Sequence, residues 1–202
     1  MKGDTHFAVG AGCASVALVF GGFLLGAPAT TASFETALLF GGMGGIAPDI
    51  DIKNSKGSKI ASIVQTVICT IFIVLTATYL FQNKGLAIGY ASMFMKELLV
   101  CIGLLVFIIA GKRSSHRGIT HSFVSCLFTT LCILAIGKAE GFMWAIGYLS
   151  HLMIDYPNNK GEELLWPKKD RYCLKLCKSD GLVNRILLWF GLVSVVTTLR
   201  LI

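Results

Sequence analysis

Seven long apolar runs, separated by short polar stretches, constrain this chain more than any other feature of its sequence. A helix needs about 20 apolar residues to cross the hydrocarbon core of a bilayer, with a range of about 17 to 25. The runs cover residues 7–27, 34–48, 60–82, 90–111, 122–138, 141–157 and 182–201. We therefore predict an all-α integral membrane bundle of about seven transmembrane segments. Residues 1–202 would form a single membrane-embedded domain with its site at the cytoplasmic helix ends.

Composition indicates that lipid is the main solvent of this chain. Charged residues make up only 14% of the 202 residues, whereas a soluble domain usually carries about 25%. The seven cysteines are odd in number and five lie inside apolar runs, which argues against a disulfide scaffold. The net charge of +7 does not indicate nucleic acid, because the basic residues lie between apolar runs, next to the headgroups. We expect membrane lipid as a partner and no nucleic acid, and the oligomeric state stays open.

The basic residues also predict how the chain threads the membrane. With the N-terminus in the cytoplasm, seven crossings place 14 of the 18 lysines and arginines on the cytoplasmic side, as the positive-inside rule requires. The run 34–48 is short, and Gly41 and Gly45 give it a face that allows close helix packing. This run could instead be a re-entrant half-helix. Re-entry would split the basic residues between both faces, so their distribution favours seven crossings.

All four histidines and three aspartates fall at the cytoplasmic ends of the predicted spans. The placement of basic residues and that of histidines are separate features, and one topology satisfies both. Imidazoles and carboxylates together suit zinc, manganese or iron, and this many ligands could hold one or two ions. The seven candidate ligands are His6, Asp49, Asp51, His116, His121, His151 and Asp155. The sequence thus predicts a divalent-metal site on the cytoplasmic face, with zinc as the first expectation.

Two motifs carry the aspartate pair and a histidine pair. P-D-I-D places Asp49 and Asp51 two apart, and in an extended stretch both carboxylates would share a face and could bind one ion or bridge two. A solvated acidic turn is the alternative. S-H-R-G-I-T-H-S places His116 in a loop and His121 at the start of the next helix, with a glycine for the tight turn between them. Arg117 between them is a fork for phosphate or carboxylate, although the histidines could also be caps or interfacial side chains.

The remaining motifs lie near the N-terminus and at the end of the sixth run. H-L-M-I-D places His151 and Asp155 at i and i+4 on one helical face. They could be two ligands of one ion, a ligand with a supporting carboxylate, or a helix-surface hydrogen bond. D-T-H supplies His6 but indicates little on its own. Glu162 and Glu163 follow in the largest cytoplasmic loop, where we expect them to be solvated unless the loop folds back and makes one a general base.

These motifs together resemble one family. The combination of T-H with a glycine four residues on, P-D-I-D, H-R-G-I-T-H-S and G-Y-L-S-H-L-M-I-D followed by L-L-W-P resembles the YdjM-like membrane-bound metal-dependent hydrolases over residues 5–167. The resemblance implies that the seven candidate ligands line a metal site and that the protein lies in a prokaryotic inner membrane. Ile52 stands where the family often has a histidine. A fainter similarity to zinc-dependent phospholipases C and related nucleases favours phosphoesters.

The function we expect is therefore a metal-dependent hydrolase that acts on a phosphoester or lipid-linked phosphate at the cytoplasmic leaflet. Asp49 or Asp51 would bridge the ions, and Arg117 would stabilise the developing negative charge. One alternative is a transporter or sensor of divalent metal, although apolar span cores offer such an ion no path. Another is a structural membrane protein in which a metal ties helix ends together.

Overall fold

The computed structural model describes the chain except for residues 26–28, 54, 83–86 and 180. It does not describe the helical side chains of residues 22–25, 56–57, 68–69, 72–73, 76–82 and 87–98 either. The described residues form helices joined by loops and contain no β-strand, which confirms the predicted all-α class. The elements are α1 (Gly3–Leu25), α2 (Thr31–Thr36), the π-helix η1 (Ala37–Gly41), α3 (Gly42–Ile46), the 3₁₀ helix η2 (Ala47–Asp51), α4 (Lys56–Gln82), α5 (Ala87–Arg113), the 3₁₀ helix η3 (Ile119–His121), α6 (Phe123–Ile136), α7 (Lys138–Asp155) and α8 (Leu182–Leu201).

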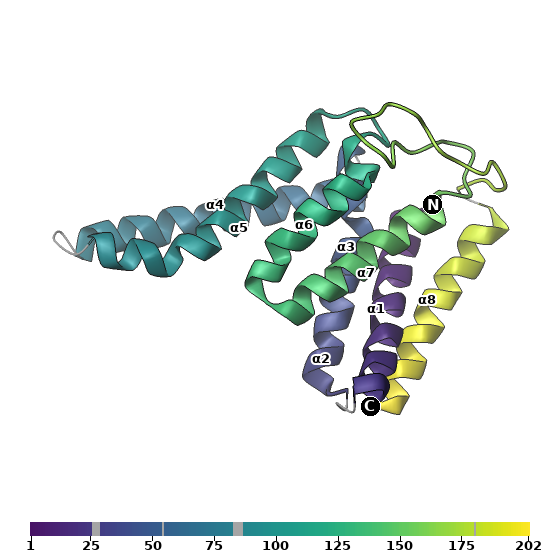
Figure 1. The fold of residues 1–202 in the computed structure, drawn as a ribbon, viewed down its shortest axis with the longest axis horizontal. Coiled ribbons are helices and arrows are strands. Elements are labelled where there is room, and N and C mark those ends of the chain that lie inside the picture. The colour runs from purple at the N-terminus through teal and green to yellow at the C-terminus, as the bar shows by residue number, and fades with distance from the viewer. Residues whose placement is uncertain (26–28, 54, 83–86, 180) are drawn as a thin grey trace.

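The helices pack so that distant parts of the sequence meet at one end of the bundle. α1 lies against α8, α3 and α7, and α7 in turn packs on α3 and α6. Figure 1 shows the end of α7 beside the N-terminus, and the loop that follows α7 runs over this end. The hairpin of α4 and α5 leans away from the direction of α1 and α8. The end that carries the N-terminus and the long loop is therefore where α1, α7 and their loops can share a site.

Glycines let three backbones approach closely next to that end. A Cβ atom on Gly10 of α1 or on Gly147 of α7 would collide with the carbonyl oxygen of Gly41. A Cβ on Gly45 would collide with the carbonyl oxygen of His6. The close packing predicted for Gly41 and Gly45 is thus confirmed, and it brings α1 and α7 against η1 and α3, which carry these two glycines.

The predicted second span is not one regular helix. Residues 31–51 pass through α-helix, π-helix, α-helix and 3₁₀ helix in turn. The 3₁₀ helix begins at Ala47, and its second residue, Pro48, cannot donate a backbone hydrogen bond and so interrupts the α-helical pattern. This change of helix type decides where Asp49 and Asp51 point.

The outer faces of several helices carry large exposed apolar side chains. On α8, Leu182, Ile186, Trp189 and Val193 are all more than half exposed and recur at helical spacing. Within the described residues, the segments Gly3–Gly21 and Leu182–Leu201 are long and apolar enough to cross a membrane. Such surfaces are typical of lipid-facing helices. The helical segments agree with the seven predicted runs, while the number that cross the membrane stays a prediction.

Candidate metal centre

Five of the seven predicted ligands converge at the bundle end covered by the long loop. They come from the first turn of α1, from η2, from η3 and from the last turns of α7, and all are buried. Their sequence positions span most of the chain, so only the tertiary fold brings them together. These five are His6, Asp49, His121, His151 and Asp155.

The centre of this cluster, which we call the central triad, consists of Asp49, His121 and His151. The Nε2 atoms of the two histidines lie 3.2 Å apart. Asp49 Oδ1 lies 4.0 Å from Nε2 of His121 and 3.9 Å from Nε2 of His151. One nitrogen from each ring and one carboxylate oxygen therefore face a common point, which is the arrangement of three ligands around an ion.

The contacts of the two Nδ1 atoms favour lone pairs on both Nε2 atoms. His151 Nδ1 lies 2.7 Å from the carbonyl oxygen of Gly45, so Nδ1 must carry the proton and donate it. His121 Nδ1 faces the Asp51 carboxylate at 3.4 Å, which favours a proton on that nitrogen as well. Two lone pairs at 3.2 Å repel each other unless a cation lies between them. Zn–N distances of 2.0–2.1 Å in a tetrahedral site place two nitrogens about 3.3 Å apart, so the donors fit such an ion.

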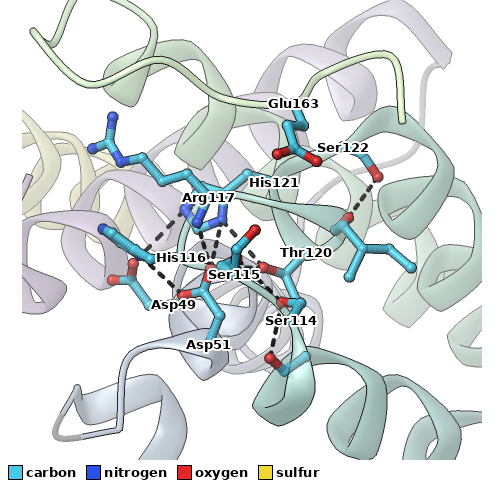
Figure 2. A network of polar contacts seen from close by, with 12 residues as sticks. Asp49, Asp51, Ser114, Ser115, His116, Arg117, Thr120, His121, Ser122 and Glu163 are labelled. Atoms are coloured by element: carbon cyan, nitrogen blue, oxygen red, sulfur yellow. Dashed lines mark hydrogen bonds and ion pairs between the residues drawn. The ribbon is translucent and has the colours of Figure 1, made fainter. Parts of the chain in front are cut away.

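Asp51 lies behind His121, on the side away from the central triad. Its Oδ2 accepts hydrogen bonds from the backbone N–H of Arg117 at 2.7 Å and from Thr120 Oγ1 at 3.2 Å, and Oδ1 lies 3.4 Å from His116 Nδ1. Figure 2 shows these contacts converging on Asp51 beside Asp49. Burial alone would raise the pKa of Asp51, but the hydrogen bonds from His116 and His121 outweigh it and hold the pKa well below its usual value. Asp51 is thus an anion that fixes the orientation and tautomer of His121.

The expectation that P-D-I-D is extended is wrong. The motif forms a 3₁₀ turn, in which residues two apart point in different directions because each residue rotates the chain by a third of a turn. Asp49 therefore meets Nε2 of His121, whereas Asp51 meets Nδ1 of the same ring. The two carboxylates do not share a face.

A second group of possible ligands adjoins the central triad and shares His151 with it. His6 Nε2 lies 3.3 Å from Asp155 Oδ1, and the His6 ring stacks on the His151 ring with centroids 3.7 Å apart. Neither ring nitrogen of His6 has a hydrogen-bond partner among the described residues, although both are buried. Asp155 also binds the N-terminal ammonium of Met1. His6, His151 and Asp155 could hold a metal ion by their spacing.

Arg117 links the second group to the loop above it. The sequence predicts that the glycine after Arg117 makes the tight turn. The structure instead gives Arg117 the left-handed backbone, with φ 63°, so Arg117 is the strained residue of this turn. The guanidinium donates to Asp155 Oδ2 and to the carbonyl oxygen of Lys160, and Nε has no partner among the residues described. The Arg117 guanidinium therefore binds a carboxylate of the protein itself, and its Nε–H remains a buried donor without a partner among the described residues.

The family model for the YdjM inner membrane protein matches residues 1–201. The chain belongs to this family. The YdjM family is described as an inner membrane protein, in agreement with the apolar helices of this fold. No curated protein and no solved structure matches the chain.

His116 lies at the edge of this YdjM-family site. Its side chain is 41% exposed, and it contacts Asp51 on the side remote from the central triad. The seven residues predicted to form one ligand set thus divide into five that converge, one that supports His121 and one at the exposed rim.

The long loop contributes buried polar groups that the sequence did not indicate. Glu162 is 0% exposed and Glu163 only 8%, so the expectation that both are solvated is wrong. Asn158 is buried as well, and its Nδ2 lacks a partner within the described part of the chain. Polar residues in a loop usually face water, so the sequence does not predict their burial. The backbone hydrogen bonds of Glu162 with Tyr172 and of Glu163 with Arg117 show that this loop folds back over the site.

Proposed function

We propose that this protein is a metal-dependent hydrolase that cleaves phosphoesters at the cytoplasmic surface of the inner membrane. The observation that carries the proposal is the pair of facing Nε2 atoms in the central triad, 3.2 Å apart, whose rings are both tied by Nδ1 to fixed acceptors. A protein that needed these histidines only for packing would not aim two lone pairs at each other.

One divalent ion is the occupancy that the ligands support best, with zinc first and manganese or iron as alternatives. The central triad and the group of His6, His151 and Asp155 both require His151. His151 has only Nε2 to offer because Nδ1 donates to Gly45, so the two groups cannot both be complete at once. When bound, the ion would supply an activated water and neutralise negative charge on phosphoryl oxygens.

The protein's own groups around the triad suit an anionic, oxygen-rich substrate. Arg117 Nε and Asn158 Nδ2 are buried donors without partners among the described residues. Buried donors of this kind cost free energy unless a ligand accepts from them. They lie in the loop that covers the site and in the turn that this loop contacts, where they could bind the oxygens of a phosphate group.

An apolar cavity beside the site supports a lipid-linked substrate. It lies next to η2, so an acyl chain within it would end close to Asp49. Its lining includes Ile46, Ala47, Ile50, Phe107 and Trp144. The exposed apolar faces of the bundle already meet lipid in the proposed setting, so the substrate would not need to leave the membrane.

Phosphate release from detergent-purified protein tests this proposal. Phosphatidic acid in mixed micelles and soluble phosphate esters would be offered before chelation, after chelation and after adding back zinc or manganese. We expect turnover that chelation abolishes and one of these metals restores, and a loss of at least about 100-fold in His151→Ala. Glu163→Gln, a change outside the triad, serves as the matched control. Turnover that survives chelation, or none from any ester with metal-loaded protein, would contradict the proposal.

A further inference from the structure

Glu162 occupies a fixed position in the loop that covers the metal centre. Its backbone N–H donates to the carbonyl oxygen of Tyr172 at 3.0 Å, and Tyr172 returns a hydrogen bond at 2.9 Å. The N–H of the next residue, Glu163, donates to the carbonyl oxygen of Arg117 at 3.1 Å. Arg117 in turn donates to Lys160, two residues before Glu162. These bonds hold the Glu162 stretch against the turn that carries Arg117.

The side chain of Glu162 has no structural task that explains its burial. It is 0% exposed, and neither carboxyl oxygen has a hydrogen-bond partner among the residues that the structure describes. Arg117, whose charge acts on Glu162, gives its guanidinium to Asp155 and to the Lys160 carbonyl instead. A buried carboxyl without partners is costly, so an apolar residue would serve better if only packing mattered.

The surroundings of Glu162 favour its protonated form. Burial and the negative charges of Asp155 and Asp49 raise the pKa of Glu162 to about 9, against the lowering effect of Arg117 and the N-terminal ammonium. Burial is the largest of these effects and does not depend on the charge at the metal centre, so it favours a proton on Glu162 that no acceptor in the described structure uses.

We propose that Glu162 is a catalytic residue of this site, the proton donor to the leaving alcohol of a phosphoester. The inference rests on the hydrolase function proposed above. The oxygen of a water forms the new bond to phosphorus, and the ester P–O bond breaks with its electron pair on the alcohol oxygen. Glu162 transfers its proton to that oxygen, and the proton released by the attacking water restores the carboxyl group. Ester and water thus become phosphate and alcohol, with Glu162 unchanged.

This role defines the class of substrate. The alkoxide of an aliphatic alcohol is a poor leaving group and needs a proton, whereas a nitrophenolate leaves readily without one. A site with a dedicated proton donor is therefore suited to esters of aliphatic alcohols, the kind of bond that joins phosphate to glycerol or to a lipid alcohol. General acid catalysis typically contributes a factor of about 100 to 10,000 to such a reaction.

The test compares Glu162→Gln with Glu163→Gln, its neighbour in sequence. Gln keeps the shape of Glu but cannot give up a proton, and Glu163 differs from Glu162 in that its carboxylate has a partner, Arg171 at 3.4 Å. Two probes, p-nitrophenyl phosphate and glycerol 3-phosphate, are assayed with metal-loaded protein. Metal content is measured in each variant. Infrared spectroscopy at pH 7 records the C=O stretching band of protonated carboxyl groups.

We expect Glu162→Gln to lose at least about 100-fold in kcat/KM for glycerol 3-phosphate and little for p-nitrophenyl phosphate, with its metal retained. The infrared band should weaken in Glu162→Gln and stay in Glu163→Gln. An equal loss on both probes, no loss on either, or no Glu162-dependent band would overturn the inference while leaving the hydrolase function in place. Wild-type, metal-loaded protein that cleaves neither these two probes nor phosphatidic acid in mixed micelles would overturn the hydrolase function, and the inference with it.

Discussion

The side chains of this site show how burial and neighbours assign different states to similar acids. Asp51 and Glu162 are both buried, but Asp51 accepts hydrogen bonds from His116, from His121 and from the backbone N–H of Arg117, whereas Glu162 accepts none from the described residues. The pKa of Asp51 therefore falls and that of Glu162 rises. An anion that orients His121 and an acid that holds a proton can thus coexist in one small volume.

The raised pKa of Glu162 predicts how stability depends on pH. Unfolding returns the group to its ordinary value near 4.5, so between that pH and about 9 the unfolded chain is deprotonated while the folded protein keeps its proton. The stability contributed by this group is fully present below pH 4.5 and is lost as pH rises toward 9, by at most about 1.4 kcal/mol per pH unit. In Glu162→Gln this loss is absent.

Thermal unfolding in detergent at pH 5 and pH 8 checks this prediction. The unfolding temperature of Glu162→Gln relative to that of the wild type should be higher at pH 8 than at pH 5. For Glu163→Gln, the difference from the wild type should be the same at both pH values. A difference between Glu162→Gln and the wild type that does not change with pH would show that Glu162 titrates normally.

At the scale of elements, the site depends on how closely α1, η1 and α7 approach one another. The carbonyl oxygen of Gly41 lies where a Cβ on Gly10 or Gly147 would be, so side chains at these positions would push the backbones apart. His6 is on α1 and His151 is on α7, and their stacked rings would separate with the helices. Glycine at these positions therefore serves the geometry of the metal centre as well as packing.

Two alanine substitutions on the same helix test this relation. Gly10→Ala would meet a backbone oxygen that cannot move aside, and we expect it to lower the free energy of unfolding by about 1–3 kcal/mol. A Cβ on Gly21 would meet nothing within 4 Å, so Gly21→Ala should be neutral or stabilising by up to about 1 kcal/mol because alanine favours the helix. Denaturant unfolding of the two variants measures both effects. Equal effects would refute the close-approach argument.

The sequence predicts those parts of the fold that depend on local pattern. The run 182–201 coincides with α8, and the i, i+4 spacing of His151 and Asp155 correctly predicts that both lie on one face of a helix, α7, where they are close enough to hold one ion. Prediction from the sequence fails where contacts between residues far apart in the chain determine the local conformation. The 3₁₀ form of P-D-I-D separates Asp49 from Asp51, and Arg117 has a left-handed backbone while its N–H donates to Asp51, a residue 66 positions away. The burial of Glu162 depends on pairing with Tyr172, which no local pattern reveals.

For the whole molecule, the proposed setting is the inner membrane with the metal centre on the cytoplasmic side. The family assignment and the apolar faces of α1 and α8 agree with the membrane location. The loop that covers the centre is rich in lysine and arginine, which favours the cytoplasm. The substrate would then be reached from the inner leaflet.

Labelling of single cysteines tests this orientation. In a cysteine-free background, Asn159→Cys lies in an exposed part of the covering loop, and Thr31→Cys is exposed at the start of α2, near the opposite end of the bundle. A membrane-impermeant maleimide should label Asn159→Cys in inverted vesicles only and Thr31→Cys in intact spheroplasts only. The reverse pattern would place the centre on the outer face.

The most direct test of the account is the metal content of the detergent-purified protein, measured by elemental mass spectrometry. We predict about one equivalent of zinc, manganese or iron per chain in the wild type. His121→Ala and His151→Ala should lose it while keeping their helical content, whereas His116→Ala, altered at the exposed rim, should retain it. Wild-type protein that carries no metal and binds none when ions are added back would contradict the metal centre and the hydrolase function that depends on it.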